Sequence, residues 1–400
     1  MPASEKPLAC VIGDMDLVRP LGLAGIHSAA VATPGELTRY SRFTAAVIDW
    51  ADPWKAPEKL LERLLEFGRA QSKPPVLYYE GDWDLLLVSR NRGVLGEVFR
   101  FSIADPELIE DLVDKERFRE LARRLGLPVP PSAVLADGDD AIDALRLPVI
   151  VKPLTRQWET WEPLAGKAKA LRIETRPELR RLARQLAEAG VDAVVQELIP
   201  GPETAIESYH VYIDEGGEIA AEFTGKKIRT YPLELGQSSA LEITDDAGVA
   251  SLGREIVAQL GLRGVAKFDF KRAADGTLHL LEINPRFNLW HHPGARAGVN
   301  IPAIVYADLV GLPRPAAGPV TPGVLWCHPR LDYTAARAAG VSTARWVAWM
   351  AGCEAKSGMS WDDPLPVVRR GAWHLSRRLL PRRGAAADPA EHFPTAPTGA

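Results

Sequence analysis

Short apolar runs alternate with helical segments through the first hundred residues of the chain. LACVIG, HSAAVAT, TAAVIDW and PPVLYYEG are mostly apolar, and KAPEKLLERLLEFGRA has the spacing of an amphipathic helix. Such alternation is typical of a parallel sheet with crossover helices, because parallel strands are buried on both faces and need long connections. It predicts an N-terminal α/β domain whose ligands collect at the carboxyl ends of the strands.

The predicted strand ends carry polar residues but no dinucleotide-binding fingerprint. Asp14, Glu36, Glu80 and Asp82 follow the apolar runs, and no G-x-G-x-x-G motif follows the first strand. NAD or FAD binding is therefore not indicated. We expect the loops at 14–19 and 79–82 to border a substrate pocket instead.

Composition narrows the class of protein. The 400 residues are 46% hydrophobic and 25% charged, which is enough for two or three domains. A net charge of -4 gives no case for nucleic-acid binding, and three cysteines without paired spacing predict neither a zinc cluster nor a disulfide framework. No apolar run approaches the roughly 18 residues of a membrane helix. We expect a soluble, cytoplasmic protein that acts on small molecules, with a homodimer as one option.

A charged helical stretch that ends in LGLPVPPS predicts a domain boundary near residue 114. Beyond it, LPVIVKPL and AVVQELIPG predict strands of a second unit, and antiparallel strands with an Asp-Gly turn predict a third. The fold class is α/β combined with α+β. The expected units are an α/β domain (1–113), a small subdomain (114–200), a catalytic subdomain (201–313), a C-terminal extension (314–381) and a disordered Pro/Ala/Gly tail (382–400).

The stretch LHLLEINPR carries polar residues where a buried strand should not. Side chains alternate across a strand, so Glu282, Asn284 and Arg286 point the same way, whereas Ile283 faces the core. Asp269, in KFDF, precedes the Asp-Gly turn and is expected opposite Glu282. These oxygen donors suit Mg2+ or Mn2+ that shares its ligands with phosphate, or they form a solvated sheet face.

The charges around this acid pair help to decide between a metal site and a solvated sheet face. Like charges at such a distance repel unless a cation joins them, which predicts that a neutral residue at 282 leaves the metal-free protein as stable or slightly more so. Lys115, Lys152 and Arg286 are cations of the kind that a metal-bound polyphosphate needs. These cations favour a site for a metal ion and a polyphosphate over a solvated sheet face.

The order VIVKP, QELIPG, FDF and LEINPR resembles that of the ATP-grasp superfamily, which includes biotin carboxylase and D-alanine ligase. The similarity covers about residues 114–311, and FTGKKIRTYPLELGQSS resembles a subgroup of ATP-dependent carboligases related to D-aspartate ligase. The resemblance implies a pre-ATP-grasp domain followed by two subdomains that grip ATP and Mg2+. It also implies an ADP-forming ligase that joins a carboxylate to an amine through an acyl phosphate.

The resemblance implies roles for single residues as well. It makes Arg286 and Lys152 catalytic, it assigns the metal to Asp269, Glu282 and Asn284, and it assigns ATP to Lys115, Lys152, Gln196, Glu197, Leu198, Glu203, Lys227 and Arg229. Among these, Gln196 to Leu198 would lie beside the adenine and Glu203 near the ribose. By their residue types alone, Lys115, Glu203, Lys227 and Arg229 also fit exposed surface charges.

Departures from the superfamily pattern leave other functions open. The glycine-rich phosphate flap is replaced by TRQWETWEPLAGKAKA, in which Arg156 or Lys167 could compensate, so a regulatory protein with reduced turnover is one alternative. Carboxylation through carboxyphosphate is another, although no biotin-attachment sequence is evident. His291 and His292 fit a proton acceptor or a packing role. The basic segment 371–384 fits a solvated helix or an acidic membrane surface.

Overall fold

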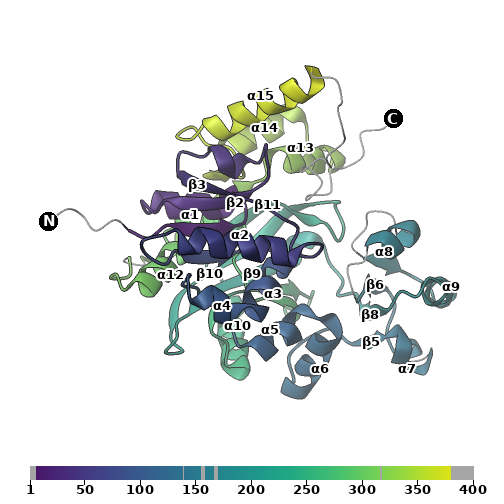
Figure 1. Cartoon of the computed structure of the whole chain (residues 1–400). Coiled ribbons are helices and arrows are strands. Elements are labelled where there is room, and N and C mark those ends of the chain that lie inside the picture. Colours follow the sequence, from purple (N-terminus) through teal and green to yellow (C-terminus); the bar gives the residue numbers. More distant parts are fainter. Residues whose placement is uncertain (1–5, 138, 155–157, 166–169, 316–317, 380–400) are drawn as a thin grey trace.

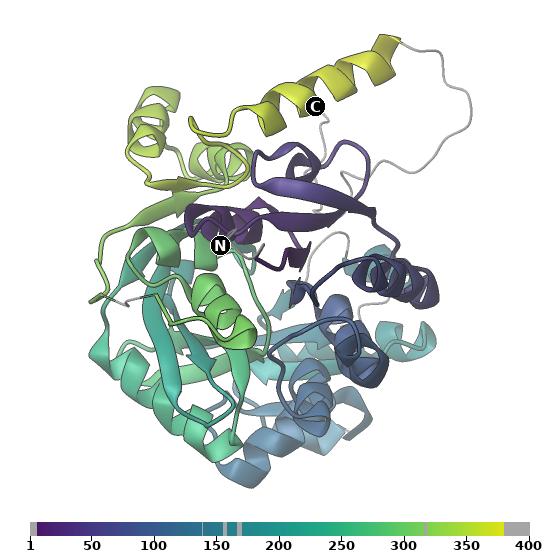
Figure 2. The same ribbon diagram turned by 60° about the vertical axis from the view of Figure 1, so that its left-hand side comes forward.

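The described part of the chain forms three β-sheets surrounded by helices (Figure 1 and Figure 2). The computed structural model describes residues 6–137, 139–154, 158–165, 170–315 and 318–379. The predicted tail at 382–400 and the flap residues Arg156 and Lys167 lie outside these ranges. Within them, no helix has both the length and the apolar character needed to cross a membrane.

The first third of the chain contains the predicted parallel sheet, in the order β3-β2-β1-β4. Strands β1, β2 and β4 are buried along their whole length, as expected for strands covered on both faces. The strands are β1 (Ala9–Ile12), β2 (Ser28–Ala32), β3 (Thr44–Asp49) and β4 (Val76–Tyr79). The helices are α1 (Met15–Leu23), η1 (Leu37–Tyr40), α2 (Pro57–Arg69), α3 (Asp82–Arg90) and α4 (Arg92–Gly96).

Two helices, α5 (Pro106–Val113) and α6 (Lys115–Leu125), lead out of this domain. The Asp114 side chain caps α6 by accepting hydrogen bonds from the backbone N–H groups of Glu116 and Arg117 at 3.0 and 2.9 Å. Gly126 ends the helix in the left-handed region, with φ of 65°. The cap makes Lys115 the first residue of α6.

A small antiparallel sheet follows, in the order β5-β8-β6-β7, with a hydrophobic core of its own. Trp161, Val195 and Leu186 are buried in that core. Its strands are β5 (Ser132–Val134), β6 (Val149–Pro153), β7 (Leu171–Ile173) and β8 (Ala193–Glu197). Its helices are η2 (Leu135–Asp137), α7 (Asp139–Asp143), α8 (Trp158–Ala165) and α9 (Arg176–Glu188).

The third sheet has seven strands in the order β13-β12-β9-β10-β11-β14-β15, and we call it the central sheet. Its first five strands are β9 (Ile206–Ile213), β10 (Ile219–Tyr231), β11 (Gln237–Thr244), β12 (Gly264–Arg272) and β13 (Leu278–Asn284), all paired antiparallel. The accompanying helices are η3 (Glu203–Ala205), α10 (Ala247–Leu260), α11 (His291–Arg296) and α12 (Ile301–Val310).

The segment after residue 313, whose structure the sequence left undefined, extends the central sheet. Strand β14 (Leu325–Cys327) pairs with β11, and β15 (Ala355–Lys356) pairs with β14. Helices α13 (Pro329–Ala338) and α14 (Thr343–Ala351) lie between these strands in the chain, and α15 (Leu365–Leu379) follows them. The extension therefore contributes strands to the sheet that carries the predicted site.

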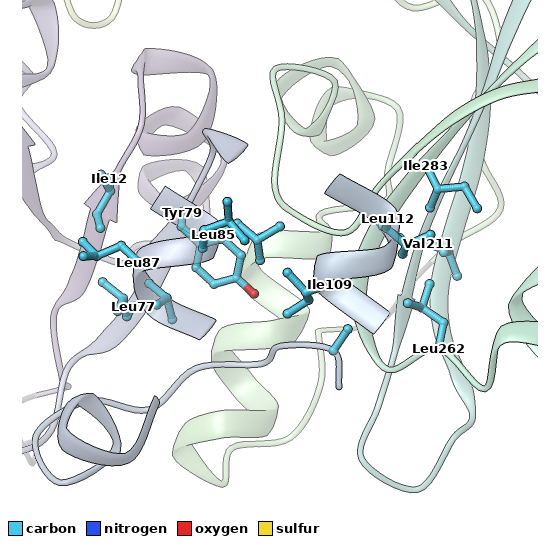
Figure 3. Packing of buried hydrophobic residues seen from close by; sticks show 14 of the residues in the cluster. Ile12, Leu77, Tyr79, Leu85, Leu87, Ile109, Leu112, Val211, Leu262 and Ile283 are labelled. Carbon is cyan, nitrogen blue, oxygen red and sulfur yellow. The ribbon is translucent and has the colours of Figure 1, made fainter. Parts of the chain in front are cut away.

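One hydrophobic cluster joins the N-terminal sheet to the central sheet (Figure 3). Leu77 and Leu85 from the N-terminal domain lie on one side of α5, and Val211 and Ile283 of the central sheet lie on the other. Ile283 is only 3% exposed, which confirms that it faces the core. The two sheets are thus packed as one unit, with the small sheet outside it.

Candidate active site

Acidic side chains meet on one face of the central sheet. Strand pairing places Asp269 of β12 opposite Glu282 of β13, which confirms the expectation that they are cross-strand neighbours. On the next strand, Ser208 lies opposite Asp269 and its hydroxyl donates a hydrogen bond to Asp269 Oδ1. Alternation turns Phe268 and Ile283 toward the opposite, buried face.

Lys267, a residue that the sequence did not single out, holds the acid pair. Its Nζ donates to Asp269 Oδ2 at 2.6 Å, and Asn284 Nδ2 donates to Glu282 Oε1 at 3.0 Å. The side chain of Glu282 is exposed, and its partial desolvation raises its pKa, but Lys267 and hydrogen bonds with Asp269 and Asn284 lower it by more, so the pKa lies below its usual range. The chain itself supplies a cation that contacts Asp269 and acts electrostatically on Glu282.

The oxygen donors on this face fit a divalent cation. Asp269 and Glu282 offer carboxylates and Asn284 offers an amide oxygen, the ligand types that Mg2+ and Mn2+ prefer. In the described part of the chain, no three His, Cys, Asp or Glu side chains form a metal cluster. A metal held here would therefore complete its coordination with substrate or water oxygens, as Mg2+ does beside phosphates.

Arg286 connects this face to the N-terminal sheet. Its Nε donates to Asp82 Oδ1 at 2.6 Å, and its Nη2 donates to Asn284 Oδ1 at 3.1 Å. Burial lowers the pKa of Arg286, but Asp82, Glu282 and Glu80 raise it by more, so the pKa lies above its ordinary value. The guanidinium is thus a fixed positive charge beside the acid pair.

Lys152 reaches the site from the small sheet. Its Nζ donates to Gln196 Oε1 on the neighbouring strand at 3.2 Å. Burial lowers the pKa of Lys152, and the negative charges of Glu282 and Glu203 partly oppose that effect. Since Glu282 acts on this lysine, the two side chains face the same region although they belong to different sheets.

The other residues expected to contact ATP from the small subdomain lie near Lys152. Lys115 Nζ donates to the backbone oxygens of Pro153 and Leu154, directly after Lys152. The backbone N–H of Leu198 donates to Pro148 O at 3.0 Å. Glu197, also on the expected hinge, accepts from the backbone N–H of Arg146 at 2.8 Å. These contacts bring Lys115, Lys152 and the hinge strand together.

Glu203 and Lys227 share their surroundings with a second lysine that sequence reasoning missed. Lys271 is 4% exposed, its Nζ lies 3.6 Å from Glu203 Oε1, and it donates to Gly201 O at 2.9 Å. Burial lowers the pKa of Lys271, Glu203 opposes this, and Lys227 adds to it. Lys227 also helps to lower the pKa of Glu282, so it lies on the acid-pair face.

Arg229 has a different partner. Its Nε and Nη2 donate to the two carboxylate oxygens of Asp332 in α13, each at 2.8 Å, and its guanidinium lies 4.1 Å from the Trp349 ring centroid. Asp332 is fully buried. Because a bidentate, buried ion pair occupies its donors, we omit Arg229 from the proposed ATP contacts and assign it to anchoring the C-terminal extension.

Carboxylates at the edge of the N-terminal sheet lie beside Arg286. The backbone N–H of Asp14 donates to Glu80 Oε2 at 2.9 Å, and that of Gly81 donates to Asp84 Oδ2 at 3.0 Å. Burial raises the pKa of both Glu80 and Asp84 to about 7, against the opposing effects of these hydrogen bonds and of Arg286. Both acids therefore change protonation near neutral pH.

We expect Asp84→Asn to stabilise the protein more at pH 8 than at pH 5. The raised pKa means that the contribution of Asp84 to stability is present near pH 4 and is lost as the pH rises through about 7. Asparagine does not titrate and can still accept from Gly81. Melting temperatures of parent and variant between these pH values measure the effect, with the exposed Asp245→Asn as control. A difference that stays constant with pH would contradict it.

The histidine pair lies in the core, at the start of α11. His292 Nδ1 is 2.8 Å from Asp16 Oδ1, and its pKa is lowered by burial despite that carboxylate. Burial lowers the pKa of His291 to about 3, and its ring packs edge-on against Phe287. Among the described residues, neither ring nitrogen of His291 has a hydrogen-bond partner. These surroundings favour a packing role for both.

Comparison with known proteins supports the sequence resemblance. A family model described as "ATP-grasp in the biosynthetic pathway with Ter operon" matches residues 189–326. The chain is 27% identical over 288 residues to D-aspartate ligase of Enterococcus faecium, covering 68% of each protein. It is 30% identical over 209 residues to D-alanine--D-alanine ligase of Chromohalobacter salexigens, covering 48% of this chain and 63% of that relative.

Solved structures show the same fold. An ADP complex of N5-carboxyaminoimidazole ribonucleotide synthetase superimposes with a TM-score of 0.61 at 14% identity, covering 81% of this chain and 82% of that one. Biotin carboxylase from Campylobacter jejuni gives 0.61 at 15% identity, covering 80% and 74%. The chain therefore has an ATP-grasp fold, and its sequence is similar to those of two ligases.

Proposed function

We propose that the protein activates a small carboxylic acid with ATP and joins it to an amine, with Mg2+ bound at the acid pair. The observation that carries the proposal is the meeting of Asp269 and Glu282 with Arg286 on one sheet face, opposite Lys152 of the small sheet. Two carboxylates that hold a metal, surrounded by cations, suit a triphosphate during phosphoryl transfer. The bound metal would neutralise phosphate charge.

In the proposed reaction, a carboxylate oxygen attacks the γ-phosphorus and the bond to ADP breaks. The amine nitrogen then attacks the acyl carbon, phosphate leaves, and the nitrogen loses a proton. Lys152 and Lys115 hold the phosphates, Gln196, Glu197 and Leu198 border the adenine, and Glu203 borders the ribose. Lys227 adds positive charge, and Arg286 stabilises the oxygens that become negative. Positioning and electrostatics supply most of the rate.

The N-terminal sheet edge supports an amine as the second substrate. Glu80 and Asp84 lie beside Arg286, and both titrate near pH 7. A protonated amine fits carboxylates, and a group with a pKa near the working pH can accept its proton. Because the relatives are named D-aspartate ligase and D-alanine--D-alanine ligase, we propose amino acids as the first substrates to test.

We also propose a cytoplasmic location for the protein.

Release of ADP and phosphate tests this function. The protein would be incubated with ATP, Mg2+ and pairs of amino acids or other carboxylates, and products would be identified by mass spectrometry. We expect ADP release to require one carboxylate and one amine, to stop in excess chelator, and to transfer label from an 18O-labelled carboxylate into phosphate. AMP as the product, or phosphate without label, would exclude the acyl-phosphate route. Bicarbonate as the only active carboxylate would favour the carboxylase alternative.

A further inference from the structure

Apolar side chains are exposed together where the chain approaches α15. Trp361 is 97% exposed, and Met359, Leu365, Val367 and Val368 are also exposed. A contiguous apolar group on a protein surface is typical of an interaction site, whereas scattered apolar residues are not. We call these residues, together with the exposed Arg369, the α15 surface.

The loop that presents Trp361 is tied firmly to the N-terminal domain. Arg19, which is 1% exposed, donates to Asp362 Oδ1 at 2.7 Å. The backbone N–H of Arg42 donates to Asp363 Oδ1 at 3.1 Å, and its Nη1 donates to Asp362 O at 2.8 Å. The two residues after Trp361 are thus anchored while the indole faces solvent. Little conformational entropy would be lost when the indole binds a surface.

Helix α15 covers the N-terminal domain with one side only. It contacts η1, and a Cβ at Gly35 would lie 2.8 Å from the Trp373 ring, so that ring packs directly on the glycine. Leu365, Val368 and Ala372, spaced three and four apart, share another face and are exposed. Figure 1 and Figure 2 show the helix at the periphery of the molecule, in yellow.

The charge of this region determines which partner fits. Helix α15 has no acidic residue, and it has four arginines, at 369, 370, 377 and 378. A second copy of the chain would bring like charges together, which is unfavourable. Anionic lipid headgroups complement the arginines, and tryptophan favours the interface between headgroups and acyl chains.

We propose that the α15 surface binds anionic membranes, with Trp361 and the exposed apolar side chains of α15 at the headgroup boundary and Arg369 on the lipid phosphates. The contact is peripheral, because an amphipathic helix of this type lies in the plane of the membrane. It uses none of the residues proposed for ATP or the acid pair. The ligase reaction and the membrane contact are therefore separable.

Sedimentation of the full chain with lipid vesicles tests the proposal. We expect binding to phosphatidylcholine vesicles that contain phosphatidylglycerol, weaker binding at high salt, and little binding to phosphatidylcholine alone. Arg369→Gln should weaken binding about fivefold, since each arginine contributes roughly 1 kcal/mol near an anionic surface. Trp361→Ala should weaken it about tenfold or more.

Arg123→Gln is the matched control, because it removes the same charge from an exposed position on α6. This control should bind vesicles like the parent, and melting curves should show that all variants fold. Absence of binding to anionic vesicles, or equal loss in the control and the α15 variants, would overturn the proposal. So would sedimentation of a dimer without lipid that Trp361→Ala converts to monomer, because a second copy would then occupy this surface.

Discussion

Glu282→Gln is expected to lower ADP-forming turnover about 100- to 1000-fold, the usual effect of removing one preorganised electrostatic group. The substitution keeps the shape of the side chain and removes the charge that would hold the metal. The expected effect on stability is now reversed from the sequence-based prediction. Lys267 and hydrogen bonds hold the pKa of Glu282 below its usual range, so the ionised carboxylate stabilises the fold above about pH 4, and this contribution is lost as the pH falls.

At pH 7 the Gln variant should therefore melt slightly earlier than the parent, not later. Ile283→Ala is the control from the same strand. Ile283 is in the core, so its truncation should destabilise the protein by about 2 to 5 kcal/mol while the folded fraction still turns over. Turnover and melting temperature would be measured for both. Normal ADP release by the Gln variant would show that β13 is a structural strand and would remove the main support for the ligase site.

Arg286→Ala is expected to lower turnover by a similar factor, about 100- to 1000-fold, with a larger effect on kcat than on KM. A guanidinium that contacts transferred phosphate contributes most when charge moves onto the phosphate oxygens. The structure also gives Arg286 a second role, since its 2.6 Å contact with Asp82 joins the central sheet to the N-terminal sheet. The two roles need separate tests.

Asp82→Asn separates them, because it weakens the contact between the sheets and leaves the arginine in place. If Arg286 acts on phosphate, the Asp82 variant should retain activity within about tenfold of the parent, well above the Arg286→Ala variant. Equal losses in the two variants would mean that Arg286 acts by positioning the domains. Arg286→Lys adds a useful comparison, since lysine keeps the charge but not the forked geometry of two donors.

Much of this site follows from alternation along single strands. An Asp-Gly turn joins the strands of Asp269 and Glu282, so the two acids could be predicted to lie close together. Their exact pairing depends on a register shift between Asp269 and Phe270, which places Glu282 instead of Leu281 opposite Asp269. Alternation along KFDFK places Lys267 and Lys271 on the face of Asp269. Both lysines could therefore have been predicted from the sequence, but they were missed.

Other features depend on packing between distant segments. Asp82 and Arg286 are 204 residues apart, and the bidentate contact of Arg229 with Asp332 spans 103 residues. The raised pKa values of Glu80 and Asp84 come from burial against neighbouring elements. No local pattern encodes such contacts, because each depends on how whole sheets and helices meet. The strands of the C-terminal extension were missed for a related reason. Strands β14 and β15 are short, and they are strands only because they pair with the edge of the central sheet.

The separate core of the small sheet has a consequence for how the protein can be divided. A fragment that starts near residue 114 would lack Leu77, Leu85 and Ile109 and would expose Val211 and Ile283 of the central sheet to water. Such a fragment should aggregate, although the sequence predicts a domain boundary near residue 114. We instead expect the amide hydrogens of the segment from β5 to β8 to exchange with solvent as one cooperative unit, independently of the rest of the chain. The reason is that the buried side chains of this segment contact one another. Truncation studies should therefore remove or replace that segment and keep the rest of the chain intact.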